Sequence, residues 1–283
     1  MSTAMKQPAH KDNPIGVFDS GIGGLSVLRA LRTRLPNEDF LYVADSLNCP
    51  YGGRSAQEIA TLSRGIAGYL VERRVKLIVV ACNTASAAAL ADLRQAFSVP
   101  FVGMVPAVKP AVGLTQTGVV GVLATPMTFE GRLYHEVVEH YAGGVRVISS
   151  TCDGLVERIE AGDLDGPQTQ TLLRTCLRPI LEAGADTLVL GCTHYPFVER
   201  AIRRIVGPAV RILEPSAAVA EQAARVLDRE GLRRLAGEEG TVRFATTGSP
   251  QQFAAALEAV LGLQAPVAHL VWEGNCLQDD PMA

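Results

Sequence analysis

Residues 77–84, LIVVACNT, combine an apolar run typical of a buried strand with a cysteine and a threonine at its carboxyl end. A similar run, TLVLGCTH, occupies residues 187–194 and also ends in a cysteine, here followed directly by a threonine. A second pair, GVFDS at 16–20 and GVLAT at 121–125, is separated by nearly the same number of residues. Two pairs at nearly one offset indicate that the chain is built from two duplicated halves.

Apolar, β-branched runs alternate with helix-like stretches along the chain, which is the rhythm of βαβ units in parallel sheets. We therefore expect an α/β fold. In open parallel sheets, ligands bind beyond the carboxyl ends of the strands, so two sheets facing one another would place one thiol on each side of a cleft. The residues expected at those strand ends are Asp19, Asp45, Cys82, Thr125 and Cys192.

The boundary between the halves is predicted near Val108, where KPAVG forms a hinge-like connection. The first domain would comprise residues 14–108 and 218–283, and the second would comprise residues 109–217. The C-terminal stretch contains one further predicted strand, TVRFATTG, and one helix, PQQFAAALEAVLG, which is too little for a third domain. We expect this stretch to pack back onto the first half.

Composition argues against several classes of protein. The formal net charge of −3, with arginines scattered along the chain, gives no electrostatic footprint for nucleic acid. No apolar run is as long as a membrane span, and the polar N-terminal segment lacks the apolar core of a signal peptide, so we expect a cytosolic protein. The six cysteines are widely spaced, which predicts neither a disulfide framework nor a zinc ribbon. A homodimer is compatible with the sequence but not specified by it.

A glycine-rich turn follows the first predicted strand in GVFDSGIGG, residues 16–24. Such turns usually bind phosphate, but this spacing matches neither the dinucleotide-binding pattern nor a Walker loop. The carboxylate of Asp19 at the mouth of the turn would repel a phosphate and attract an ammonium group. We therefore expect a zwitterionic ligand, and the alternative for Asp19 is a structural role in capping the following helix.

Cys82 and Cys192 are predicted to lie at equivalent strand ends, where a thiolate can act as nucleophile or base. A single buried cysteine is most often structural, but a matched pair favours function. Two thiols on opposite faces of one carbon can invert it, because one removes the α-proton while the other delivers a proton. A Cys-His protease would leave one thiol without a role, and a zinc site needs more ligands than Cys192 and His194 provide.

Four segments, FDSGIGGLSVL, ADSLNCPYG, ACNTAS and GCTHYPF, together resemble the cofactor-independent glutamate racemases of the aspartate/glutamate racemase superfamily. The likeness continues through GVLATPMTF, LVERIEAG and ATTGSPQQF, and so covers nearly all of residues 14–253. It implies two pseudo-symmetric, Rossmann-like domains with the active site in the cleft between them, and neither pyridoxal phosphate nor a metal. The implied substrate is L- or D-glutamate, and the D-glutamate would supply peptidoglycan synthesis.

Two alternatives stay open at this point. A relative in the same superfamily could act on aspartate or another amino acid, although His194 after GCT favours glutamate, because the aspartate branch typically carries a glutamate residue there. A non-enzymatic ligand-binding module with two domains is the other alternative, and it would not explain the paired thiols.

The resemblance also implies roles for individual residues. Cys82 and Cys192 would be the two acid/base thiols, and Asp19 and His194 would assist them. The positions that match substrate contacts in the family are Asp19, Ser20, Tyr51, Gly52, Asn83, Thr84, Thr193 and His194.

Further residues match the family less specifically. Glu160 and Asp45 correspond to acidic positions linked to catalysis, and surface placement is the alternative for both. Thr125 and Thr128 are candidate contacts on the second half. Cys49, in the loop before the Pro-Tyr-Gly motif, is interpreted as a packing residue.

Overall fold

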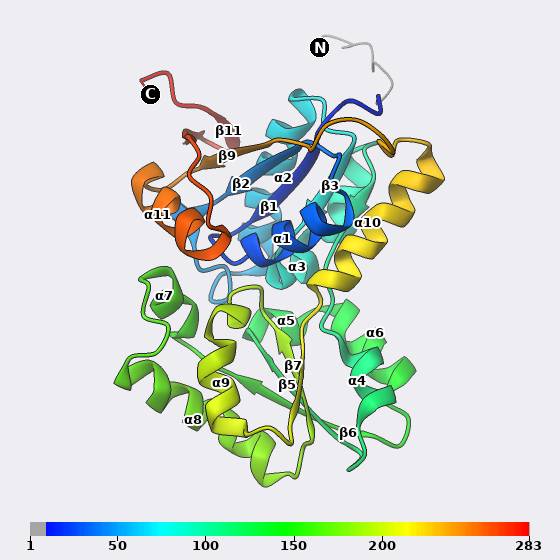
Figure 1. The fold of residues 1–283 in the computed structure, drawn as a ribbon, viewed down its shortest axis with the longest axis vertical. Coiled ribbons are helices and arrows are strands. Elements are labelled where there is room, and N and C mark those ends of the chain that lie inside the picture. Colours follow the sequence, from blue (N-terminus) through cyan, green and yellow to red (C-terminus); the bar gives the residue numbers. More distant parts are fainter. Residues whose placement is uncertain (1–9, 283) are drawn as a thin grey trace.

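The computed structural model describes residues 10–282, which form two α/β units drawn one above the other in Figure 1. Residues 1–9 lie outside the described residues. They make up most of the polar N-terminal segment, which is predicted not to be a signal peptide. One unit is built on a seven-stranded sheet of order β11-β10-β9-β2-β1-β3-β4, and the other on a four-stranded sheet of order β6-β5-β7-β8. The expected α/β class with two parallel-rich domains is confirmed.

Helices cover both faces of the larger sheet. Its strands are β1 (Ile15–Asp19), β2 (Phe40–Ala44), β3 (Leu77–Val80), β4 (Phe101–Val102), β9 (Val242–Thr246), β10 (Val267–Glu273) and β11 (Cys276–Asp279). On one face lie α1 (Leu25–Arg34), α10 (Ser216–Glu230) and α11 (Pro250–Leu261), and on the other α2 (Ala56–Glu72) and α3 (Asn83–Ala96). Val17 joins the core of the first face and Phe18 that of the second, so β1 is buried on both sides, as is usual for central parallel strands.

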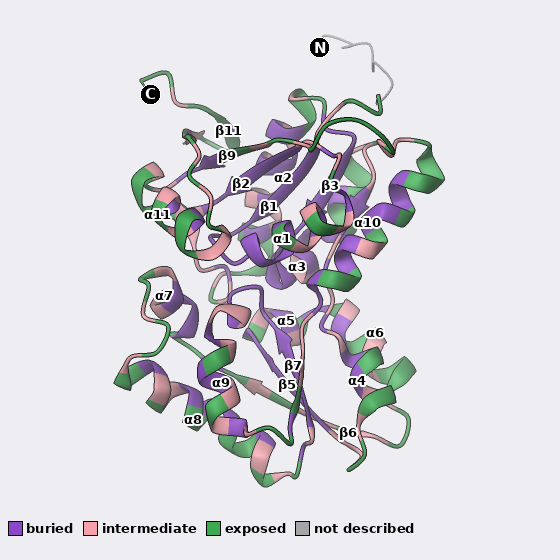
Figure 2. Ribbon diagram, in the orientation of Figure 1, coloured by how far each residue is buried: buried purple, intermediate pink, exposed green. Residues whose placement is uncertain are grey.

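The smaller sheet is covered in the same way. Its strands are β5 (Val119–Ala124), β6 (Arg146–Thr151), β7 (Thr187–Gly191) and β8 (Arg211–Leu213). One face packs against α7 (Leu155–Glu160), α8 (Pro167–Glu182) and α9 (Glu199–Val206), and the other against α4 (Val108–Leu114) and α6 (Arg132–Tyr141), with α5 (Pro126–Glu130) beside α3 and α6. Figure 2 shows that β5 is mostly buried whereas the edge strand β6 is partly exposed. Within residues 10–282, the helices are too short or too polar to cross a membrane.

The C-terminal stretch returns to the larger sheet and contains more strand than the sequence predicts. β9 pairs in parallel with β2, so residues from the two ends of the chain share one sheet. The prediction of a single strand is wrong, because β10 and β11 add an antiparallel hairpin. Gly274 takes a positive φ of 59° at its turn, and β11 after it is only four residues long and mixed in composition, so it carries little strand signal. The domain boundaries stay a prediction.

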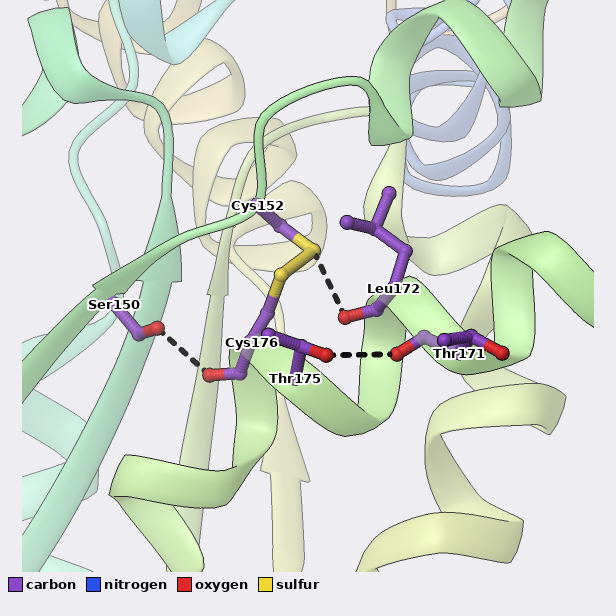
Figure 3. The surroundings of a disulfide bond; sticks show 6 residues. All are labelled: Ser150, Cys152, Thr171, Leu172, Thr175 and Cys176. Carbon is purple, nitrogen blue, oxygen red and sulfur yellow. Dashed lines mark hydrogen bonds between the residues drawn. A yellow bond between two sulfur atoms is a disulfide. The ribbon is translucent and has the colours of Figure 1, made fainter.

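The sequence predicts no disulfide framework, but the structure contains one disulfide bond. Cys152, just after β6, is bonded to Cys176 in α8, with their Cα atoms 5.4 Å apart (Figure 3). Ser150 also donates a hydrogen bond of 2.7 Å to the carbonyl of Cys176, which fastens the strand to the helix. The packing of α8 beside β6 brings the pair together, and cysteine spacing along the chain gives no sign of it.

Candidate active site

The two cysteines expected to be catalytic lie where the strand ends of the two sheets approach each other. Cys82 follows β3 and Cys192 follows β7, and each side chain is buried, with 4% and 7% of its surface exposed. A hydrogen bond of 3.4 Å from Thr193 to the Asp19 carboxylate, at the end of β1, joins the two units beside them. The matching strand ends inferred from the sequence therefore lie in one site.

Cys82 is the residue just before α3, and its Sγ accepts a hydrogen bond of 3.4 Å from the backbone N–H of Ala85. Burial raises the pKa of Cys82 well above its ordinary value, and the negative charges of Asp19 and Cys192 raise it further. The helix N–H opposes this effect without cancelling it. Cys82 is therefore a neutral thiol near pH 7, the form that can donate a proton.

Asp19 is fully buried and holds the glycine-rich turn together. Its Oδ2 accepts a hydrogen bond of 2.5 Å from the backbone N–H of Gly24, the residue just before α1. Burial raises the pKa of Asp19, although the nearby charge of His194 and hydrogen bonds, including that of Gly24, lower it in part. The turn is rich in glycine for a steric reason as well, since a Cβ at Gly23 would collide with the ring of His194. Asp19 thus supports the turn and also contacts the Cys82 thiol.

His194 links Cys192 to a carboxylate. Its Nδ1 lies 3.9 Å from Cys192 Sγ, and its Nε2 is hydrogen-bonded at 2.6 Å to Oε1 of Glu160, the last residue of α7. Burial disfavours the charged ring, but hydrogen bonds with Cys192, Cys49 and Glu160 outweigh it and raise the pKa of His194 well above its usual value. Burial would raise the pKa of Glu160, but bonds to His194 and other donors lower it overall. The pair is therefore an ion pair, and Glu160 belongs to the site, not to the open surface.

Cys49 does more than pack. It contacts the main core, as expected, but its Sγ also lies 3.5 Å from Glu160 Oε1 and 3.9 Å from Ser20 Oγ. Ser20 Oγ is in turn 4.0 Å from Cys82 Sγ, so this hydroxyl lies between two thiols. Burial raises the pKa of Cys49 to about 11. The interpretation of Cys49 as a packing residue alone is therefore incomplete.

Asp45, at the end of β2, fixes the loop that carries the Pro-Tyr-Gly motif. It accepts hydrogen bonds from the Tyr51 hydroxyl at 2.6 Å, Thr247 at 2.8 Å and the Trp272 indole at 2.9 Å, and from Asn48 in the 3₁₀ turn η1 (Ser46–Asn48). The hydroxyl of Tyr51 is thus committed to Asp45. Sequence reasoning missed Thr247 and Trp272, because only the return of β9 and β10 to the sheet brings them to this loop.

Gly52 belongs to the same motif and lies against the second unit. A Cβ placed on Gly52 would come within 3.1 Å of the Thr125 side chain, so the loop approaches the strand end of β5 closely. Thr125 also shares hydrogen bonds of 2.9 Å with Thr84 and with Thr128. These hydroxyls form a chain across the boundary between the two units.

Asn83 is the most direct sign of a ligand. Its side chain is buried, yet neither its amide nitrogen nor its amide oxygen has a hydrogen-bond partner among the described residues. An unsatisfied buried amide costs free energy, so this group is a candidate to bind a ligand. Asn83 directly follows Cys82 and is the first residue of α3.

Comparison with known proteins agrees with this geometry. The family described as Asp/Glu/Hydantoin racemase matches residues 15–223. The chain is 54% identical, over 85% of its length and 89% of the relative, to the glutamate racemase of Roseiflexus sp.. Its fold resembles that of glutamate racemase RacE1 from Bacillus anthracis, with a TM-score of 0.86, 33% identity and coverage of 94% and 100% of the two chains.

A further solved structure is the glutamate racemase of Francisella tularensis in complex with D-glutamate. It has a TM-score of 0.81 and 31% identity, and the match covers 93% of this chain and 98% of that one. These likenesses extend over both sheets and over the segments that carry both thiols. The chain belongs to the Asp/Glu/hydantoin racemase family, and within it to the glutamate racemases.

Proposed function

We propose that the chain interconverts L- and D-glutamate with Cys82 and Cys192 as its two acid/base groups. The observation that carries this proposal is the pair of buried thiols at matching strand ends of two facing sheets, with the unpaired amide of Asn83 on the residue that follows Cys82. A single base could exchange an α-proton, but inversion is simplest when a second group protonates the opposite face. The product D-glutamate would serve peptidoglycan synthesis.

Reaction from L-glutamate needs one thiol as base and the other as acid. The Cys192 thiolate takes the α-proton, and the electron pair left on Cα delocalises into the α-carboxylate. Cys82 then delivers its proton to the other face, which leaves Cys82 as thiolate and Cys192 as thiol. The raised pKa of Cys82 suits it to this acid step. The positively charged ring of His194, 3.9 Å from Cys192, is placed to stabilise the thiolate form of that residue by charge.

The other residues of the site suit a dicarboxylic amino acid. Asp19 offers the only carboxylate on the glycine-rich turn of residues 20–24 and its adjoining strand end, and would attract the substrate ammonium group. Asn83, Thr84 and Thr193 are suited to the α-carboxylate, and Ser20 with backbone N–H groups near Gly52 to the side-chain carboxylate. The racemase of Francisella tularensis, which shares this fold, was solved with D-glutamate. A homodimer and a cytosolic location stay predictions.

The substrate is tested by supplying L-glutamate and L-aspartate separately to the purified chain and following optical rotation. We expect L-glutamate to approach the racemic mixture and L-aspartate to stay unchanged on the same time scale. Racemisation of L-aspartate alone would assign the chain to the aspartate branch. A matched sample of Cys82→Ala, treated in the same way, should be inactive and excludes a contaminating racemase.

A further inference from the structure

Three side chains with different ligand chemistry converge beside the thiols. Cys49 lies in the loop after η1, Glu160 ends α7, and His194 follows β7. One sulfur, one carboxylate oxygen and one imidazole nitrogen from these residues all lie within 4.8 Å of one another. Segments distant in the sequence thus supply a cysteine, a histidine and an acid to a single point.

This donor set fits a small thiophilic cation better than it fits calcium or magnesium, because those ions prefer oxygen ligands alone. Zinc is bound at about 2.3 Å from sulfur and about 2.0–2.2 Å from nitrogen or oxygen, so tetrahedral ligands lie roughly 3.3–3.6 Å apart. The distance of 3.5 Å between Cys49 Sγ and Glu160 Oε1 already lies in this range. The 2.6 Å His194–Glu160 hydrogen bond must lengthen as the ion replaces the shared proton, and Cys49 must release its thiol proton to solvent when it binds the ion.

The cluster also adjoins space that an ion can use. Cys49 and Glu160 line a pocket of about 330 Å³, together with Ile22, Pro50 and Gln252. Cys82, Asn83 and the buried His194 do not line this pocket, so an ion that enters here meets Cys49 and Glu160 first, without passing between the catalytic thiols. Three protein ligands leave a fourth tetrahedral position for water, as in open zinc sites.

We infer that Cys49, Glu160 and His194 form a binding site for a thiophilic divalent cation such as Zn²⁺, and that occupancy inhibits the enzyme. The bound ion holds the imidazole of His194 and the carboxylate of Glu160, so the ion pair that places a charged imidazolium beside Cys192 is lost. The inhibitory part of this inference rests on the proposed racemase activity, whereas the binding part does not.

Direct binding gives the test. Isothermal titration with ZnCl₂, and absorption spectra with Co²⁺ as a coloured substitute, are recorded on the purified full chain without substrate. We expect one ion per chain and a thiolate-to-cobalt charge-transfer band. Cys49→Ser should weaken binding by at least about tenfold and abolish that band. Cys276→Ser, which alters an exposed free thiol elsewhere, should bind as the unaltered chain does.

Two further variants keep the outcome decisive. Glu160→Gln retains the size of the side chain but loses its charge, so it should also weaken binding even if Cys49→Ser folds poorly. Cys82→Ala should bind zinc normally. Loss of binding in Cys82→Ala but not in Cys49→Ser would overturn the assignment and place the ion between the catalytic thiols. Undiminished binding in both Cys49→Ser and Glu160→Gln would also overturn it.

Inhibition is measured separately, as the rate with zinc divided by the rate without it for each variant. We expect the unaltered chain to be inhibited and Cys49→Ser to resist at the same zinc concentration. Zinc binding without inhibition would overturn the regulatory half alone. An inactive chain that still binds one zinc ion through Cys49 would contradict the proposed function and leave the binding site standing.

Discussion

Oε1 of Glu160 lies 2.6 Å from Nε2 of His194 and also accepts a hydrogen bond of 2.9 Å from the backbone N–H of Ile22. The first bond lies within the second unit, and the other reaches into the glycine-rich turn of the first. One carboxylate therefore orients the imidazole beside Cys192 and joins the two halves of the site. The resemblance associated Glu160 with catalysis, and these contacts give it a positioning role.

The ion pair predicts a stability that depends on pH. The pKa of His194 is raised, so its contribution is complete below about pH 6.5 and is lost as pH rises through the raised value. The pKa of Glu160 is lowered, so its contribution is present above about pH 4.5 and is lost as pH falls through the lowered value. Stabilisation by the pair is therefore greatest between these limits.

Glu160→Gln should consequently lower the free energy of unfolding by about 1–3 kcal/mol at pH 6 and by less at pH 10. Urea unfolding at both values measures the difference. Glu157→Gln, an exposed change on the same helix, is the matched control and should have little effect at either pH. A loss at pH 6 no larger than that of Glu157→Gln would contradict the assignment of a charged pair.

Asp19→Asn should reduce kcat/KM by about 10²-fold or more, because it removes the charge proposed to hold the substrate ammonium group while preserving size. Its melting temperature should stay near that of the unaltered chain, since an amide oxygen can still accept from Gly24. Asp186→Asn is the control with the opposite expected result, a loss of stability without a loss of activity. Asp186 accepts hydrogen bonds from Thr115, Gln116 and Thr117 away from the site, so its loss should lower stability and spare activity. A fully active Asp19→Asn enzyme would leave that residue a purely structural role.

Trp272→Phe should raise KM by about three- to tenfold and change kcat less. The substitution keeps the aromatic ring but removes the N–H that donates to Asp45, a bond worth roughly 0.5–1.5 kcal/mol, and so loosens the loop that carries Tyr51 and Gly52. Steady-state kinetics with each enantiomer measure the effect. Tyr69→Phe, which removes a hydroxyl bonded to Asp279 outside the site, is the control. Unchanged kinetics in Trp272→Phe would show that the indole does not hold the loop.

Racemisation should need no added cofactor, because side chains supply every acid and base in the proposed mechanism. Dialysis against a chelator, with carbonyl reagents present to trap pyridoxal phosphate, should leave the rate unchanged or raise it by removing inhibitory zinc. A large loss of rate that only a metal ion or pyridoxal phosphate restores would be incompatible with the two-thiol mechanism.

The sequence revealed the parts of the fold that repeat and the parts that lie next to one another in the chain. Strong apolar runs identified β1, β3, β5 and β7, and the placement of Cys82 and Cys192 after two of them followed directly. The hairpin β10–β11 was not predicted because β11 has only four residues and β10 mixes apolar residues with a histidine and a glutamate. The role of Trp272 was not predicted for another reason. Trp272 reaches Asp45 only because the C-terminal stretch folds back onto the larger sheet.

The same limit applies to the cysteines. Spacing gave no sign that Cys152 would pair with Cys176, because helix packing brings them together. Nor did spacing place Cys49 beside Glu160, since these residues come from different units. Local sequence thus predicted which residues end the strands, and the tertiary structure decided which of them share polar contacts.

The division of labour between the thiols is the central claim, and hydrogen exchange in D₂O tests it most directly. In the proposed mechanism each thiol would face one side of Cα, so each should remove the α-proton of only one enantiomer. The resemblance implies that Cys192 would serve L-glutamate and Cys82 would serve D-glutamate. Variants that lack one thiol should therefore lose racemisation but keep one-sided exchange.

The measurement is NMR of the α-hydrogen, with each enantiomer supplied separately to Cys82→Ala and Cys192→Ala, and with Cys276→Ala as the control that changes neither thiol. We predict that Cys82→Ala slowly exchanges L-glutamate and returns it as labelled L-glutamate, while Cys192→Ala shows the mirror preference for D-glutamate. Equal exchange of both enantiomers by Cys82→Ala, or racemisation by it at the unaltered rate, would contradict the two-thiol account.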